Sequence, residues 1–131
     1  MQQSTSVADS NTPPLQQFDY TAPQTVNDKN YADYKTIRRN GSVVGFEPNK
    51  INIAMTKAFI AVQGGQAAAS ARIRELVDSL TQQVVNALMR RQPNGGTFHI
   101  EDIQDQVELA LMRSGEHDVA RAYVLYREQR A

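Results

Sequence analysis

The chain has 131 residues, of which 40% are hydrophobic and 21% charged, with no cysteine and no tryptophan. One compact domain is expected at this length, and the lack of cysteine excludes disulfides, a cysteine-ligated zinc ribbon and thiol chemistry within these residues. The apolar runs are far shorter than the roughly 20 residues that span a bilayer. Met1–Ser10 carries neither a basic start nor an apolar stretch, so we expect a cytoplasmic protein with no membrane partner.

The formal net charge is zero, yet the charges are unevenly divided along the chain. Residues 1–33 hold one lysine and four aspartates, whereas residues 34–131 hold 13 basic and 10 acidic residues. The second part is mildly cationic, too weakly to indicate a nucleic-acid partner.

Residues 1–33 predict a flexible N-terminal arm. They are rich in Gln, Ser, Thr, Asn and Asp and include three of the five prolines. Such a segment offers too little apolar surface to offset an ordering entropy of about 1–2 kcal/mol per residue. As an alternative, this arm carries a short docking peptide centred on Leu15–Tyr20.

A β-hairpin is predicted where two strand-like runs, 34–39 and 42–46, flank Asn40-Gly41. Asn-Gly favours a type I′ turn because both central positions of that turn need a positive φ.

Four amphipathic helices are predicted from apolar residues that recur at steps of three and four. Pro48 suits the first turn of the first helix, and Gly64-Gly65 ends it. The helices are expected at about residues 48–63, 70–91, 100–113 and 119–131, with a short strand at 97–99. The order β-β-α-α-β-α-α predicts an α+β, mainly α fold over residues 34–131, a four-helix bundle capped by a small three-stranded sheet.

The sequence contains no recognisable catalytic or metal-binding constellation. Neither GxxxxGK nor GxGxxG occurs, and His99 and His117 lack paired ligands or a triad arrangement. The four carboxylates between residues 101 and 108 are expected to favour the helix dipole and to stay solvated. We therefore expect no catalytic residue and no metal ligand in this chain.

Cations gather around the predicted hairpin. Arg38 and Arg39 precede the turn, and Lys50 lies in the first turn of the following helix. A lysine there opposes the helix dipole unless an anion is bound, and helix N-termini and turn amides attract phosphate. The pattern indicates a phosphate site, with the alternative that the three side chains are solvated surface.

The same segment resembles the opening of the ATP-cone family. Residues 37–41 (IRRNG) and 46–51 (FEPNKI) follow its pattern of basic residues, a turn, an aromatic residue, an acidic residue and Lys-Ile. Residues 103–111 and 120–127 resemble its last two helices, so the resemblance covers residues 34–131.

The resemblance implies an allosteric adenine-nucleotide binding domain. ATP-cones cap the large subunit of many ribonucleotide reductases and also occur in a bacterial repressor whose zinc ribbon needs cysteines. Because this chain has no cysteine, a reductase is favoured over the repressor. The connection at residues 64–69 and the loop at residues 90–96 resemble those of the aerobic class I large subunit, so the resemblance favours the N-terminal activity-control domain of a class I ribonucleoside-diphosphate reductase large subunit. In that family, which serves deoxyribonucleotide synthesis, ATP leaves the enzyme active and dATP drives an inhibited oligomer. The alternative is a non-enzymatic helical protein-interaction module or another nucleotide-sensing regulator.

The implied partners are ATP or dATP with Mg²⁺, the catalytic part of the large subunit, the radical-generating small subunit and a second copy of the domain. The residues that match the family's phosphate contacts are Arg38, Arg39, Asn40, Gly41, Lys50 and Arg127. Those expected around the adenine and ribose are Val44, Phe46, Glu47, Ile51 and Gln104.

Two of these assignments carry a specific expectation. Glu47 could accept a hydrogen bond from the adenine amino group, and Gln104 stands where some members have a histidine near the sugar, which leaves the ribose contact open. Phe46 and Ile51 have the alternative role of core residues.

Overall fold

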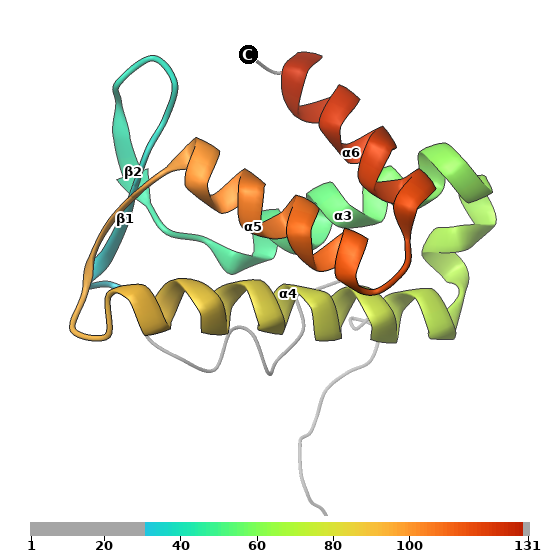
Figure 1. Cartoon of the computed structure of the whole chain (residues 1–131), viewed down its shortest axis with the longest axis horizontal. Helices are drawn as coiled ribbons and strands as arrows, with labels where there is room; N and C mark the ends of the chain where they lie inside the picture. Colours follow the sequence, from blue (N-terminus) through green and yellow to red (C-terminus); the bar gives the residue numbers. More distant parts are fainter. Residues whose placement is uncertain (1–30, 130–131) are drawn as a thin grey trace, which may run out of the picture.

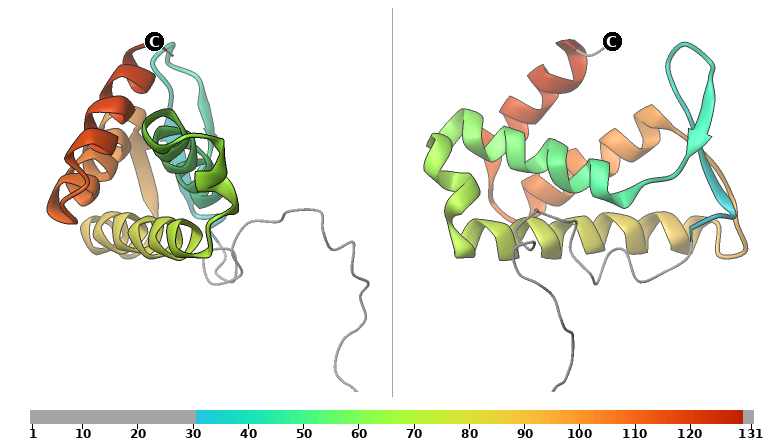
Figure 2. Two further views of the ribbon diagram at one scale, coloured as in Figure 1. Left: turned by 90° about the vertical axis from the view of Figure 1, so that its right-hand side faces the viewer. Right: turned by 180° about the vertical axis from the view of Figure 1, so that it is seen from behind.

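Three strands and four α-helices make up the part of the chain that a computed structural model describes, residues 31–129. The elements are β1 (Tyr34–Ile37), β2 (Val43–Gly45), α3 (Pro48–Gln63), the 3-10 helix η1 (Gly65–Ala69), α4 (Ala71–Arg91), β3 (Gly96–His99), α5 (Ile100–Arg113) and α6 (His117–Gln129). The strands form a sheet at one end of the helical bundle (Figures 1 and 2), which confirms the predicted fold class.

The ends of the helices follow from local chemistry. The Ser70 hydroxyl accepts a hydrogen bond from the backbone N–H of Ile73 and so caps α4. Gly64, with φ +91°, ends α3 as the glycine pair predicted. The short helix η1 was not predicted, because its five residues are too few to show a helical period.

The four α-helices pack around a common core. Helix α4 contacts α3 and α5, and α6 contacts the same two helices from the other side (Figure 2). The largest fully buried side chains come from all four helices and include Met55, Phe59, Leu80, Leu88, Leu111 and Val119. No helix within residues 31–129 is long and apolar enough to cross a bilayer.

The sheet has the strand order β2-β1-β3. Strand β1 pairs antiparallel with β2 and parallel with β3, with Tyr34 opposite Gly96 and Ile37 opposite His99. Because α5 begins at the residue after β3, this parallel pairing carries the first turn of α5 to the hairpin.

The hairpin turn differs from the predicted two-residue type I′ turn. The Gly41 N–H donates to the Arg38 carbonyl (2.9 Å) and the Arg38 N–H donates to the Ser42 carbonyl (2.8 Å), so three residues, 39–41, form the loop. Gly41 has φ +87°, and the Asn40 side-chain oxygen accepts from the N–H and the hydroxyl of Ser42. Arg39 thus lies inside the turn and not in the preceding strand.

The predicted arm, residues 1–33, lies outside the described residues except for its last three. The Tyr31 ring packs edge-on against Phe46 at 5.6 Å between centroids, and the Asp33 carbonyl accepts from the Gly96 N–H. Residues 31–33 therefore contact the domain.

Replacing Leu88 with Ala should lower the free energy of unfolding by about 2–5 kcal/mol, because the removed side chain is fully buried and leaves a cavity. The matched control is Leu125→Ala, since the Leu125 side chain is 56% exposed and its loss should cost less than about 0.5 kcal/mol. Urea unfolding followed by circular dichroism measures both values. Equal losses would contradict the placement of Leu88 in the core.

Candidate functional site

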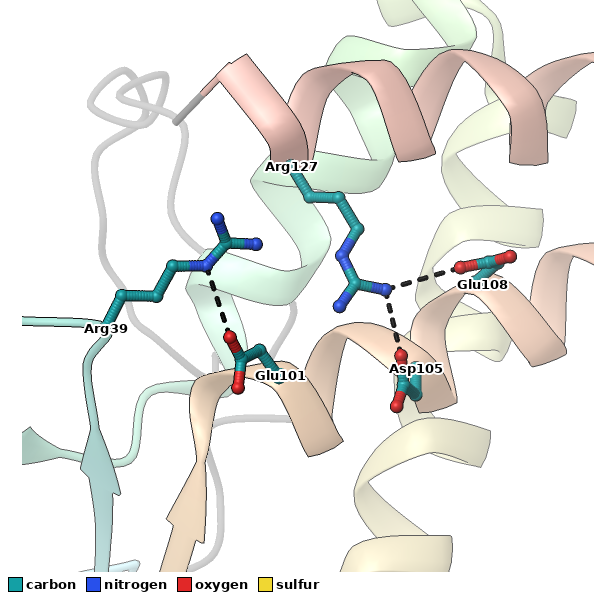
Figure 3. A network of polar contacts seen from close by, with 5 residues as sticks. All are labelled: Arg39, Glu101, Asp105, Glu108 and Arg127. Atoms are coloured by element: carbon teal, nitrogen blue, oxygen red, sulfur yellow. Dashed lines mark hydrogen bonds and ion pairs between the residues drawn. The ribbon is translucent and has the colours of Figure 1, made fainter. Parts of the chain in front are cut away.

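One face of α5 collects the polar groups of the site. Glu101, Gln104, Asp105 and Glu108 are spaced by three and four residues, which places them on the same side of the helix. Arg39 approaches this face from the hairpin turn, and Arg127 approaches it from α6 (Figure 3). The two guanidinium groups therefore share a surface although their residues are far apart in sequence.

Arg127 joins α6 to α5 through two carboxylates. Its Nη1 lies 3.0 Å from Asp105 Oδ1 and 3.3 Å from Glu108 Oε1, and its side chain is only 13% exposed. Tyr123, one turn earlier on α6, is buried, and this burial raises the pKa of its hydroxyl above the ordinary range although the nearby Arg127 opposes the shift. Arg127 is thus fixed by two carboxylates and lies near the uncharged hydroxyl of Tyr123.

Arg39 forms a weaker contact with the first turn of α5. Its Nε lies 3.6 Å from Glu101 Oε2, and the two side chains are 32% and 59% exposed. An ion pair this exposed contributes about 0–1 kcal/mol. Arg39 can therefore exchange Glu101 for another anion at little cost.

Gln104 lies between these two ion pairs along α5. Its side-chain oxygen is buried and has no hydrogen-bond partner among residues 31–129. A buried acceptor without a partner costs about 1–3 kcal/mol, so a donor from a ligand or a water molecule is favoured at this point.

The cations near the start of α3 are more exposed. Lys50 Nζ lies 3.5 Å from Glu47 Oε1, and the two side chains are 72% and 55% exposed. Arg38 is exposed and forms no ion pair with the described part of the chain. The α3 N-terminus has no side-chain cap and no acidic residue in its first turn, which leaves its dipole open to an anion.

The apolar residues assigned to the adenine divide into two groups. Phe46 and Ile51 are each 6% exposed and belong to the core, where the Phe46 ring contacts those of Tyr34 and Phe98. They fill the core role that the sequence left open. Val44 is 36% exposed on β2 and offers an accessible apolar surface.

Charges of opposite sign balance one another around this site. Arg39 and Lys50 each pair with one carboxylate and Arg127 with two, whereas Arg38 forms no ion pair with the described residues. The sequence-based interpretation of the α5 carboxylates as merely solvated was incomplete, because three of them bind arginines of other elements. Their spacing on one face could have indicated a shared role.

The chain supplies no preformed metal cage within residues 31–129, where no group of three or more His, Cys, Asp or Glu side chains could hold an ion. Mg²⁺ is usually bound by one or two carboxylates together with phosphates of a ligand.

Comparison with known proteins finds sequences similar to the region that forms this fold. The family model of the ATP cone domain matches residues 34–131. Ribonucleoside-diphosphate reductase subunit alpha of Chlamydia trachomatis serovar D is 39% identical over 104 residues, covering 79% of this chain and 10% of that protein. Vitamin B12-dependent ribonucleoside-diphosphate reductase of Thermoplasma acidophilum is 36% identical over 101 residues, covering 73% of this chain and 12% of that protein. The chain spans about a tenth of the length of these relatives.

Replacing Arg127 with Ala should lower the free energy of unfolding by about 1–3 kcal/mol, because Asp105 and Glu108 lose the cation that they share. Arg121→Ala is the matched control on the same helix. Its guanidinium is 4.0 Å from Asp118, both side chains are largely exposed, and the loss should stay below about 1 kcal/mol. Denaturant unfolding of both variants measures the two losses in the free energy of unfolding. Equal losses would contradict a stabilising role for the Arg127 ion pairs.

Proposed function

Because the chain belongs to the ATP cone domain family, we propose that it binds ATP or dATP at the α5 face and the hairpin turn and so regulates a ribonucleotide reductase. The observation that supports this site best is the meeting of Arg39 and Arg127 over α5, beside the unpartnered oxygen of Gln104. Cations from two elements and a buried acceptor suit a ligand that combines phosphates with hydroxyl groups.

The phosphates would be bound by the hairpin arginines and the start of α3. Phosphate offers Arg39 charge-assisted and bidentate hydrogen bonds, each worth about 1.5–3 kcal/mol, whereas its pair with Glu101 is exposed and weak. Arg38 has no competing carboxylate partner among residues 31–129. Lys50 and the uncapped first turn of α3 add positive potential, and Asn40-Gly41 would cover the ligand.

The nucleoside would lie against exposed groups of the same face. Val44 supplies an accessible apolar contact for the base, and the Glu47 carboxylate would accept from the adenine amino group after leaving Lys50. A ribose hydroxyl would donate to the Gln104 oxygen. Arg127, held by two carboxylates, would reach a phosphate only by giving up part of that pairing.

The regulatory role extends to parts of the protein outside this chain. We propose that it is the activity-control domain of a class I reductase large subunit in the cytoplasm, acting with the catalytic part and the radical-generating small subunit. ATP, carried with Mg²⁺, would keep the enzyme active, and dATP would inhibit it through oligomerisation. The relatives include both a subunit alpha and a vitamin B12-dependent reductase, which supports a module used in more than one kind of reductase.

Replacing Lys50 with Ala should weaken ATP and dATP binding by about ten- to hundredfold, since one charge-assisted phosphate contact is lost. Lys35→Ala is the matched control, because Lys35 is an exposed residue of β1 and is no part of the proposed site. Titration calorimetry with ATP and dATP, and with GTP as competitor, gives the affinities.

Two results of that titration would overturn the proposal. Unchanged affinity in Lys50→Ala would mean that Lys50 is a solvated surface residue and that the phosphate site is misplaced. No adenine-nucleotide binding by the parent chain would favour a protein-interaction module in place of a nucleotide sensor.

Adding dATP should increase self-association of the chain more than ATP does. A ligand shifts an association equilibrium only through different affinities for the two states, so the two nucleotides must differ in that respect. Light scattering without nucleotide, with ATP and with dATP provides the measurement. The same mass in all three samples would exclude an oligomer surface that lies within this domain.

A further inference from the structure

A pocket of about 510 Å³ lies at the start of β1, at the end of that strand opposite the Arg39 turn. Its lining comes from three places: Tyr31, Asp33 and Tyr34 at the entry to β1, Met89 of α4, and the loop of residues 93–95. None of these residues belongs to the proposed nucleotide site. The pocket therefore requires a separate explanation.

The pocket presents aromatic surface and one unsatisfied donor. The Tyr34 hydroxyl donates to the Gln92 carbonyl at 2.6 Å. The Tyr31 oxygen is buried without a hydrogen-bond partner in the described part of the chain. Burial also raises the pKa of Tyr31, so its hydroxyl keeps its proton at neutral pH. An occupant with apolar side chains and a free carbonyl would satisfy both features.

Charge does not decide what the pocket binds. Asp33 is the one charged residue that lines it. Helix α4 ends nearby with Arg90 and Arg91, but neither of them lines the pocket. The pocket therefore selects an occupant by its aromatic lining and by the Tyr31 hydroxyl.

The chain itself contains a segment with these properties. Residues 1–30 hold three aspartates against one lysine, and their only aromatic residues, Phe18 and Tyr20, lie in the segment 15–20 (LQQFDY). This segment combines three large apolar or aromatic side chains, one aspartate and two glutamines whose amide oxygens accept hydrogen bonds.

The connection between this segment and the pocket is short. Residues 21–30 separate Tyr20 from Tyr31, which lines the pocket, and ten residues reach at most about 36 Å. A connection this short gives an effective concentration in about the millimolar range. Even a weak contact would then form within one molecule, because the segment of a second copy is present at a lower concentration.

We propose that the pocket at the start of β1 binds residues Leu15–Tyr20 of the same chain. The aromatic and leucine side chains contact Tyr31, Tyr34 and Met89, and a carbonyl of the segment accepts a hydrogen bond from the Tyr31 hydroxyl. The occupant is the chain's own N-terminal segment, whatever nucleotide the domain binds.

The lack of cysteine makes a direct test possible, because one introduced cysteine can be labelled alone. Thr97→Cys, an exposed position two residues from Gly95, would carry a nitroxide label in the ¹⁵N-labelled full chain. Arg121→Cys on α6 serves as the distant label. We expect the amide signals of residues 15–20 to broaden with the label at 97 at least as strongly as those of residues 24–28, and far less with the label at 121.

Variants of the segment separate docking from simple tethering. Leu15→Ser/Phe18→Ser should abolish the excess broadening of residues 15–20, while Val7→Ser/Val26→Ser, which removes apolar side chains outside the segment, should preserve it. Broadening in the parent that declines steadily from residue 30 toward residue 1 would overturn the proposal, as would an unchanged pattern in the Leu15→Ser/Phe18→Ser variant. Broadening of ¹⁵N chains by added labelled ¹⁴N chains would also overturn it, because the occupant would then be a second copy.

Discussion

The parallel pairing of β1 with β3 is the contact on which the rest of the structure depends. The two strands are separated in sequence by β2, α3, η1 and α4, yet their register places Ile37 opposite His99. One residue beyond this pair, α5 begins, and two residues beyond Ile37, the turn presents Arg39. A shift of one residue would turn every side chain of β1 to the other face of the sheet, and Tyr34 would leave the aromatic cluster.

A consequence of this arrangement is that two arginines from different elements form ion pairs with the same helix, α5. Arg39 and Arg127 are held over one helix face by carboxylates that a phosphate would have to displace. Binding of an anion there would be an exchange of partners and not an addition of charge to an empty cationic surface. The exchange would loosen either the contact of the hairpin with α5 or that of α6 with α5, and the same helix face connects the two.

The sequence predicts the helices well because each buries one regular apolar stripe and because local signals mark helix ends, as Pro48 marks the start of α3 and Gly64 its end. It also predicts that Arg38, Arg39 and Lys50 lie near the hairpin. It could not predict the partners of Arg127, since those depend on which helix packs beside α6. The predicted turn type was wrong, because Asn40-Gly41 fits both a two-residue and a three-residue loop. Only the backbone hydrogen bond between Arg38 and Ser42 distinguishes the two.

Strand β2 is the least protected part of the sheet, since all three of its residues are exposed and it pairs on one side only. Its ladder with β1 can open without disturbing Phe46, which is anchored in the core immediately after the strand. Such local opening needs far less free energy than global unfolding, and it occurs many times in the lifetime of one folded molecule. Each opening would swing the Arg39 turn away from α5, while the helices that carry Glu101 and Arg127 stay in place.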